Sequence, residues 1–252
     1  MYNHQTENKM KKNIFYTMMV AVAMFALTSC DNDKDSEGLS SIIDYPALII
    51  QGDEFFISPI GQPYNDEGCT ATYQGKDYTD KIVVTGLEDV DINTAGLYYV
   101  TYTATSPDGY VWSETRTVAV CDPAVTTDLS GTWTTDANTY RQSGAATRPY
   151  AGCTATIKRL CPGVFTINDY LAGYYSQAVG YAAAYPGYDF DVEGVFQLTT
   201  DNKIKYISGG PAAAFGEDLP EDFQDGQYDP ATGTLSYVVT WSGMDFHVSM
   251  KK

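Results

Sequence analysis

A tyrosine-rich segment, residues 169–188, is the part of the sequence best suited to recognise a ligand. Six tyrosines lie there among glycines and alanines. Tyrosine offers a large rigid face and a hydroxyl group at a low entropic cost, and sugar rings stack on such faces. In the alternative interpretation, the tyrosines fill the mouth of an ordinary β domain. The candidate ligand contacts are Tyr174, Tyr175, Tyr181, Tyr185 and Tyr188.

Carboxylates in the following stretch offer a second kind of chemistry. Residues 188–198 are expected to form a strand with an apolar face of Tyr188, Phe190, Val192, Phe196 and Leu198. Asp189, Asp191 and Glu193 lie on the other face, about 6.6 Å apart. That spacing suits Ca²⁺, but such a row more often faces solvent. The acidic residues within 217–225 surround a proline and are interpreted as a solvent-exposed loop. We therefore predict no bound metal.

Sequence motifs for catalysis are missing. The sequence contains no G-x-S-x-G, H-E-x-x-H or phosphate-binding loop motif. Beyond the first thirty residues the only histidine is His247, which lies between Phe246 and Val248 and is expected to point away from their apolar face. We predict a protein that is not an enzyme, with no catalytic residue and no cofactor. A polysaccharide hydrolase with two carboxylates is the third functional hypothesis, because Asp and Glu are plentiful.

The charge balance excludes nucleic acid as a partner. The chain of 252 residues has 15 Lys and Arg against 32 Asp and Glu, for a net charge of -17. A polyanion would have to approach this acidic chain without a stripe of basic residues. The hydrophobic fraction of 44% is ample for a packed core, and 22 Gly with 11 Pro indicate many turns.

Residues 1–29 have the pattern of a signal peptide. Three lysines within 9–12 precede an apolar run at 14–27, which is short for a membrane span. The run ends in Leu27-Thr28-Ser29-Cys30, which resembles the bacterial lipobox. The resemblance implies cleavage before Cys30 and its acylation, and several acyl chains would anchor the protein firmly. Translation starts at Met1 or at Met10, which opens the more usual MKKNIF.

Residues 30–42 are expected to form a disordered acidic tether. The run from Asp31 to Gly38 has no apolar period to bury. It resembles the export signal that follows the acylated cysteine in surface lipoproteins of gut Gram-negative anaerobes, which implies an outer-membrane protein facing the cell exterior. A plain spacer facing the periplasm is the alternative. Since residues 1–29 hold three lysines and one glutamate, the chain from Cys30 onward has a net charge of -19.

The remaining chain has the pattern of an all-β protein. Period-two apolar runs bounded by Gly, Pro and Asp recur about every ten residues, and no long stretch shows helical spacing. A boundary falls near Asp122-Pro123, where a strand ends and a threonine-rich link begins. We therefore predict one domain at 43–122 and a second antiparallel β domain at 123–252.

The first domain resembles the bacterial surface Ig-like domain family. The residues that carry the resemblance are the motifs within 62–68, 78–82, 94–98 and 116–120, in the order and spacing of that family. It implies a β-sandwich that acts as a stalk or spacer. The chain departs from the family pattern at Glu67 and Tyr110, both expected on surface loops.

Four cysteines remain beside Cys30, and they allow three pairings. In an Ig-like sandwich the last strand runs parallel to the first, which implies that Cys121 lies near Cys69 and favours a bridge between them. Cys153 and Cys161 lie eight steps apart on one expected strand, roughly 26 Å, too far for a disulfide. Free buried thiols are the alternative for these cysteines.

The second domain has the pattern of a meander of about eight strands. Hairpin turns are expected at Pro162-Gly163, at 200–202 and at 229–233, and the turn at 200–202 would align Gln197 with Lys205. Its opening Gly131-Thr132-Trp133 resembles the G-x-W of lipocalins. The domain is similar to the lipocalin-like modules that follow Ig-like domains in surface lipoproteins. The resemblance implies a β-barrel, with a sandwich as the alternative.

Together these patterns favour a surface lipoprotein that captures an extracellular glycan or polypeptide through its second domain. Its partners would be the outer membrane, through the lipid anchor, and that ligand. The second hypothesis is a structural component of an outer-membrane surface assembly with no small ligand. The sequence does not indicate an oligomeric state.

Overall fold

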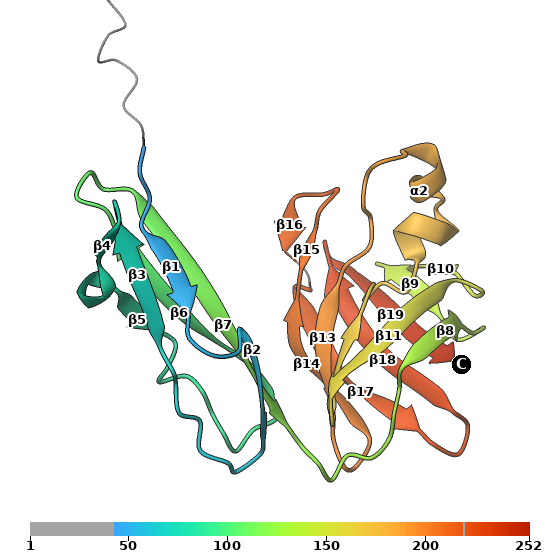
Figure 1. The fold of residues 1–252 in the computed structure, drawn as a ribbon. Coiled ribbons are helices and arrows are strands. Elements are labelled where there is room, and N and C mark those ends of the chain that lie inside the picture. Colours follow the sequence, from blue (N-terminus) through green and yellow to red (C-terminus); the bar gives the residue numbers. More distant parts are fainter. Residues whose placement is uncertain (1–42, 219) are drawn as a thin grey trace, which may run out of the picture. The chain divides into compact units, whose positions relative to one another are not determined.

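The computed structural model describes residues 43–218 and 220–252, and the side chains at 211, 212, 217, 218 and 225 are not described (Figure 1). The predicted signal peptide, the lipidation site Cys30 and the acidic tether lie outside the described residues. Within the described part of the chain, no helix is long and apolar enough to cross a membrane.

The structure is all-β, as predicted, and residues 47–121 form two sheets. One sheet has the order β1-β3-β4, and the other has the order β2-β7-β6-β5. Strand β2 is parallel to β7, and the other neighbours are antiparallel. The elements are β1 (Ala47–Ile50), β2 (Phe55–Pro59), β3 (Cys69–Tyr73), β4 (Lys76–Asp77), the 3-10 turn η1 (Thr79–Lys81), β5 (Val83–Thr85), β6 (Gly96–Thr105) and β7 (Val111–Cys121).

The β6–β7 hairpin confirms the alternation found in the sequence. Val100, Tyr102 and Ala104 are buried on one face of β6, and threonines alternate with them. The turn uses Gly109, which has a φ of 87°, a conformation that other residues rarely adopt. The buried face packs against β1 and β3 of the other sheet to form the core of this domain.

A buried arginine ties the loops of the first domain to β7. The Arg116 guanidinium forms an ion pair with Asp66 and donates a hydrogen bond to the carbonyl of Gln51. It also donates to the hydroxyl of Tyr64 at 3.2 Å and to the carbonyl of Asp53 at 3.1 Å. Because Arg116 is 2% exposed, these partners provide the hydrogen bonds that water would otherwise make.

Residues 131–251 form a closed antiparallel barrel, so the barrel is correct and the alternative sandwich is not. Each of eight strands pairs with the next, and β19 pairs with β8 to close the ring. The strands are β8 (Gly131–Thr135), β11 (Thr154–Cys161), β12 (Val164–Ile167), β13 (Gly194–Leu198), β14 (Lys203–Gly209), β17 (Asp222–Asp229), β18 (Thr234–Trp241) and β19 (Met244–Lys251).

Two short hairpins lie outside the ring. Strands β9 (Tyr140–Ser143) and β10 (Ala146–Pro149) extend the sheet beside β19. Strands β15 (Pro211–Ala212) and β16 (Glu217–Asp218) pair only with each other.

The predicted turns set the strand register. Gln197 pairs with Lys205 and Leu198 with Ile204, as the turn at 200–202 predicted. The expected strand at 188–198 is shorter than predicted, because β13 begins only at Gly194. Residues 188–193 instead bond to neighbouring loops: the amide of Gly210 donates to Glu193 O at 2.7 Å and that of Ala214 donates to Asp189 O at 3.0 Å.

The two ends of the barrel differ in their connections. Antiparallel neighbours alternate in direction, so every second connection falls at the same end. One end carries the short turns at 162–163, 199–202 and 230–233, and we call it the turn end. The other end carries the long segments 136–153, 168–193 and 210–221 and the β18–β19 turn, and we call it the loop end.

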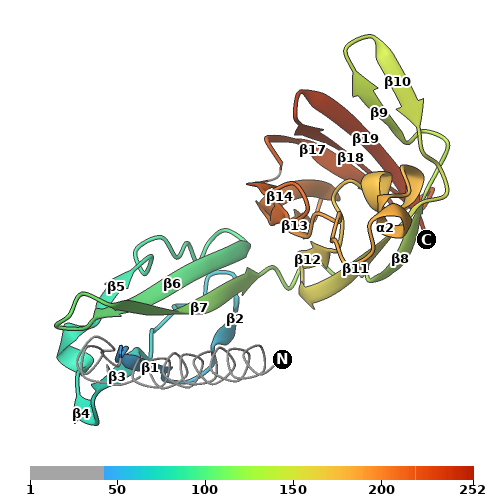
Figure 2. The same ribbon diagram turned by 90° about the horizontal axis from the view of Figure 1, so that it is seen from above.

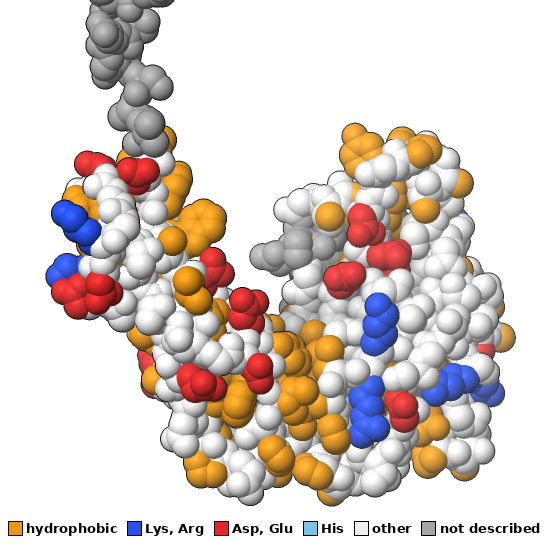
Figure 3. All heavy atoms as spheres, viewed as in Figure 1, with side chains coloured by type: hydrophobic (Ala, Val, Ile, Leu, Met, Phe, Trp, Pro, Cys, Tyr) orange, Lys and Arg blue, Asp and Glu red, His pale blue; other side chains and the backbone are white. Residues whose placement is uncertain are grey.

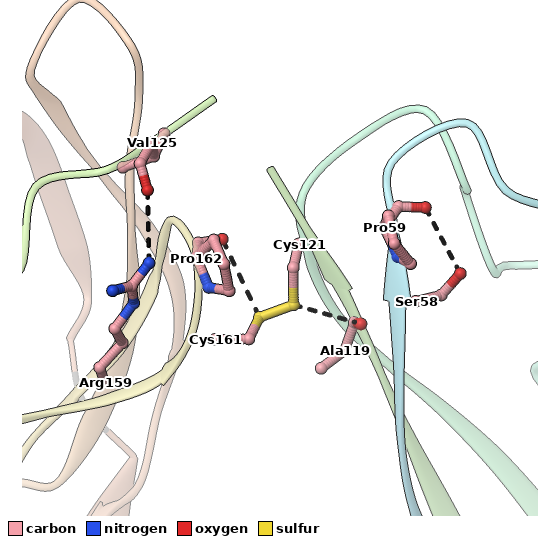
Figure 4. Close-up of a disulfide and its surroundings, with 8 residues drawn as sticks. All are labelled: Ser58, Pro59, Ala119, Cys121, Val125, Arg159, Cys161 and Pro162. Carbon is pink, nitrogen blue, oxygen red and sulfur yellow. Dashed lines mark hydrogen bonds between the residues drawn. A yellow bond between two sulfur atoms is a disulfide. The ribbon is translucent and has the colours of Figure 1, made fainter. Parts of the chain in front are cut away.

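The predicted Cys69–Cys121 bridge is wrong, because Cys121 pairs with Cys161 (Figure 4). Cys69 begins β3 in the other sheet, where it pairs with Ile50. The chain that follows Cys121 passes directly to the β11–β12 turn, where the amide of Asp122 donates to Pro162 O at 3.0 Å. The bridge therefore joins the last strand of the first domain to the turn end of the barrel. Cys69 and Cys153 are free, so the prediction that Cys153 and Cys161 do not pair is confirmed.

Candidate functional site

The tyrosine-rich segment lies across the loop end of the barrel, where the strands surround it (Figure 2). It leaves after β12 and returns at β13, with the π-helical turn η2 (Tyr174–Ala178) and the short helix α2 (Tyr181–Ala184) between them. Gly173 and Gly180 precede the two turns, each with a φ of 82°. Left-handed glycines thus let the chain fold into two compact turns instead of a strand.

A buried carboxylate fixes the start of this segment to the chain that follows it. Asp169 accepts hydrogen bonds from the amides of Leu171 at 2.9 Å, Gly173 at 2.6 Å and Val192 at 3.1 Å. Burial, together with the nearby charge of Asp191, raises the pKa of Asp169 to about 7, although the amide hydrogen bonds oppose the rise. Asp169 therefore ties the start of the segment to Val192, four residues beyond its end.

Tyr170 provides a second attachment to the barrel. Its hydroxyl donates to Val195 O at 2.6 Å and lies 3.3 Å from Ser208 O. The ring covers Gly194. A Cβ atom on residue 194 would lie 1.7 Å from Cε2 of Tyr170. Only glycine fits at that position, because any side chain would overlap the buried ring.

The next two tyrosines pass from the core to the surface. Tyr174 is 2% exposed and packs edge-on against Tyr150 and Phe246 inside the barrel. Tyr175 is half-buried. Its ring centroid lies 5.8 Å from that of Tyr181 and 5.3 Å from that of Trp241. Tyr174 thus belongs to the core, whereas Tyr175 forms the layer between the core and the surface.

The outer tyrosines line an open aromatic cleft of about 330 Å³. Tyr185 is 54% exposed and Tyr188 is 67% exposed. The rings pack against one another. The ring centroids of Tyr181 and Tyr185 are 5.6 Å apart, and those of Tyr188 and Phe190 are 6.4 Å apart. Hydrophobic side chains are visible on the surface over α2 (Figure 3). The complete lining is Tyr181, Tyr185, Tyr188, Phe190, Ala214 and Phe215.

The structure therefore divides the five candidate tyrosines into two groups. Tyr181, Tyr185 and Tyr188 meet in the cleft, where a ligand can reach them, and Tyr175 lies behind them. Tyr174 is closed off from solvent, as the alternative interpretation of a filled barrel mouth expected. Their role in binding stays a prediction.

Sequence reasoning missed two of the cleft residues. Phe190 was placed only on the apolar face of a strand, whereas it lies in the cleft between Tyr181 and Phe215. Phe215 is brought to the cleft by the β15–β16 hairpin, which is distant in sequence. Its only sequence signal is a single aromatic residue in a run of alanine and glycine.

The chemistry of the lining is apolar and aromatic. Burial raises the pKa of Tyr175 to about 12, and the nearby Arg141 guanidinium partly opposes the rise. Its phenol is therefore neutral at physiological pH. The six lining residues contribute no carboxylate, amide or basic side chain, so tyrosine hydroxyls are the polar side-chain groups that face a ligand.

The other candidate groups do not gather into a site. The carboxylate of Asp189 accepts the amide of Asp191, and Asp191 accepts a hydrogen bond from Asn168 at 3.3 Å. Among the residues that the structure describes, no three His, Cys, Asp or Glu form a group that could hold a metal ion. His247 stacks on Tyr140, with ring centroids 4.3 Å apart, and faces away from the barrel interior as predicted.

A larger hollow of about 480 Å³ lies along the outer faces of β11 to β14. Threonine, glycine and serine make up half of its lining, which also includes Lys158 and Glu193. It contains no cluster of exposed rings, and we therefore consider the smaller aromatic cleft the better candidate.

Comparison with protein families defines the class. The family of bacterial surface Ig-like domains matches residues 48–120, which confirms the resemblance seen in the sequence. A second family model, described as a C-terminal domain, matches residues 122–252, more than half of the chain. The chain thus carries a domain of the bacterial surface Ig-like family, followed by a barrel domain that matches the second family model.

A solved structure narrows this class to one family. The lipoprotein BT2262 from Bacteroides thetaiotaomicron is 32% identical, covering 82% of this chain and 100% of its own, with a TM-score of 0.45. The chain belongs to the family of this lipoprotein, as the identity and the coverage show. A comparison with curated proteins found no match.

Two solved structures of ZmpB from Clostridium perfringens are more distant. One contains the module CBM51-2 in complex with GlcNAc, and it is 19% identical over 49% of this chain and 29% of its own, with a TM-score of 0.26. The other contains the M60 catalytic domain with CBM51-1 and CBM51-2, and it is 19% identical over 51% of this chain and 14% of its own, with a TM-score of 0.27. The sequence identities and TM-scores are too low to indicate a shared function.

Proposed function

We propose that this protein is a cell-surface lipoprotein whose barrel captures an extracellular glycan or polypeptide at the loop end. The observation that supports this function is the aromatic cleft, where Tyr185 and Tyr188 expose more than half of their surface. A folded protein gains nothing in stability from exposing such rings, whereas large rigid aromatic faces are favourable contacts for a ligand.

The cleft rests on a rigid support, which suits capture. Asp169 and Tyr170 hold the start of the segment to Val192 and Val195, which follow it, and the half-buried Tyr175 packs behind the outer rings. A preorganised site loses little entropy on binding. None of the matched families is described as an enzyme family, and the proposed role is non-catalytic.

The test is a binding screen with variants of the exposed rings. Purified protein is titrated against mucin, plant polysaccharides and a pool of pentapeptides. The double variant Tyr185→Ala and Tyr188→Ala should weaken binding at least tenfold and leave thermal unfolding unchanged. Trp112→Ala is the control, because Trp112 is 45% exposed in the first domain and lines neither the cleft nor the larger hollow. No binding by the parent protein, or equal binding by the double variant, contradicts the proposal.

Anchoring at the outer membrane through Cys30 is part of the same proposal. It is supported by the lipobox-like sequence, by the lipoprotein relative and by the bacterial surface domain. We expect the full chain to incorporate radiolabelled palmitate and to fractionate with outer membranes. Cys30→Ala should abolish labelling and release the protein, and retention of the variant in membranes would contradict the anchor.

A structural role in a surface assembly is the second candidate function. Apolar side chains are exposed on strands of the first domain, namely Ile49, Phe55, Ile57, Val83 and Val84. Strands β2 and β5 are the edges of their sheet, and exposed apolar edges are typical of protein contacts. Purification of a fixed-stoichiometry complex with an outer-membrane protein, unchanged by the cleft variants, would favour this role over ligand capture.

A further inference from the structure

Two arginines face each other beside the cleft, on the β9–β10 hairpin. Arg141 and Arg148 are directly opposite in the strand register, so their side chains lie on one face of the hairpin. Arg141 is also opposite Phe246, which is fully buried in the barrel. Each guanidinium carbon is 5.6 Å from the centre of the Tyr174 ring. Both charges therefore point to the inner side of the loop end.

Among the described side chains, this pair of positive charges has no acidic partner. Like charges directly opposite in a sheet repel each other. Among the side chains that the structure describes, neither arginine forms an ion pair. The Nε of Arg141 is buried without a hydrogen-bond partner, and its Nη1 donates at 3.2 Å only to the weakly accepting sulfur of Met244. The described acidic side chains thus leave these two cations without an ion pair at one place.

An anion would remove this imbalance. Guanidinium groups bind carboxylates through parallel hydrogen bonds, and they retain their charge at any physiological pH. A carboxylate near the rim would accept from the free donors of Arg141 and Arg148 and would reduce the repulsion between them. The interaction is stronger at the half-buried Arg141 than at the exposed Arg148, because water screens the second charge more.

The arginine pair is continuous with the aromatic cleft. The Arg141 guanidinium lies over the ring of Tyr174. The ring centroid of Tyr175 is 4.8 Å from that of Tyr174 and 5.8 Å from that of Tyr181, which lines the cleft. These contacts set an upper limit on the distance between the Arg141 guanidinium and the cleft. An extended peptide of about five residues, at about 3.3 Å per residue, is long enough to span that distance. One ligand can occupy both places.

The cleft chemistry distinguishes between the two ligand classes. Each sugar ring presents several hydroxyl groups, and burying them without partners is unfavourable. The cleft lining offers no amide or carboxylate to receive those hydroxyls. An aromatic or aliphatic side chain needs no such partners, and a peptide carries a carboxylate either on an acidic side chain or at its end.

From this geometry we infer that the ligand is a polypeptide segment with an apolar side chain in the cleft and a carboxylate held by Arg141 and Arg148. The inference rests on the proposed function and specifies the class of ligand. The carboxylate comes from Asp or Glu or from the end of the chain, and the experiment separates these sources.

The test uses three pools of fluorescent pentapeptides with an aromatic residue at the second position. One pool ends in an amidated glutamate, one in an amidated glutamine and one in alanine with a free terminal carboxylate. Polygalacturonate and dextran serve as acidic and neutral glycan probes. We expect at least tenfold tighter binding of one carboxylate pool than of the glutamine pool, and a loss of this advantage at high salt.

The variants Arg141→Gln and Arg148→Gln should each reduce that preference, and together they should abolish it. Arg148 is exposed, so its variant keeps the test valid if Arg141→Gln destabilises the fold. Lys205→Gln is the control, because it removes the same charge on the outer barrel wall. The weak binding of the glutamine pool through the cleft should persist in the arginine variants.

Each other outcome overturns the inference. Equal binding of the glutamine and carboxylate pools, or a preference that survives the double arginine variant, removes the arginine role but leaves the proposed capture function intact. Binding of polygalacturonate without peptides shows an acidic glycan ligand, which again spares the proposed function. No binding of any probe contradicts both the inference and the proposed function.

Discussion

The two ends of the barrel are built from the same eight strands, yet they differ in almost every other respect. The turn end has short connections and the Cys121–Cys161 bridge. The loop end has long segments, an aromatic cleft and two arginines that form no ion pair with a described side chain. Binding residues gather where a rigid scaffold supports variable loops. The difference suggests that one end maintains the fold and the other recognises a ligand.

This division is not absolute, because part of the loop end is core. Tyr170, Tyr174 and Asp169 belong to the tyrosine-rich segment but are fully enclosed. The outer rings can vary only if this inner layer stays fixed. Mutations should therefore separate the loop end into a structural layer and a recognition layer.

The largest effect is expected for Tyr174→Ala. Removing a fully buried aromatic ring costs about 3–5 kcal/mol of unfolding free energy, because it leaves a cavity against Tyr150 and Phe246. Urea denaturation followed by tryptophan fluorescence measures the loss. A change below about 1 kcal/mol would show that Tyr174 is not part of the core.

Removing the bridge at the turn end should have the next largest effect. The double variant Cys121→Ser and Cys161→Ser releases a loop with a sequence separation of 40 residues. We expect a loss of about 2–4 kcal/mol in unfolding free energy, with ligand affinity unchanged. Cys69→Ser is the control, since Cys69 is free. An unfolding curve insensitive to reductant would contradict the bridge.

Asp169→Asn should destabilise the protein by about 1–3 kcal/mol, because an amide cannot accept all three backbone hydrogen bonds. The effect depends on pH. The folded pKa of about 7 lies above the ordinary 3.8, so the unfolded chain releases its proton first and wild-type stability falls as pH rises between these values.

The Asn variant lacks this titration, so wild type should lose about 2 kcal/mol relative to the variant between pH 5 and 7.5. The groups around Asp169 are Asp191, Tyr150, Cys153 and Tyr237, and burial or nearby charge raises the pKa of each of the last three. These three therefore remain protonated over this range. Parallel pH profiles of the two proteins would contradict the assignment.

The smallest effect on stability is expected for Tyr188→Ala, at the surface of the cleft. A side chain that is 67% exposed contributes little to folding, so the change should stay within about 0.5 kcal/mol. Ligand affinity should nevertheless fall several-fold. Thermal unfolding and titration of the same sample compare the two quantities, and a large loss of stability would place Tyr188 in the structural layer.

Local signals explain what the sequence could predict. The β6–β7 hairpin and the Gln197–Lys205 register follow from alternating side chains and turn residues within about twenty positions. The all-β class and the outer tyrosines follow from similarly local patterns. The barrel required a further step, because its closure depends on β8 meeting β19, more than a hundred residues later.

Non-local contacts explain what the sequence could not predict. Cys161 reaches Cys121 only because the link after residue 121 returns to the β11–β12 turn. Phe215 and the arginine pair reach the loop end through two separate hairpins. Residues 188–193 alternate like a strand, but their hydrogen bonds go to loops. No local pattern contains this information.

Amide hydrogen exchange with and without ligand tests the division between the two ends most directly. The measurement uses the tightest probe from the binding screens and compares exchange at both ends of the barrel. We predict that ligand slows exchange in residues 174–190 and 213–216, while residues 161–164 and 199–203 remain unchanged. Protection confined to the turn end or to the first domain, with the cleft unaffected, would contradict the account.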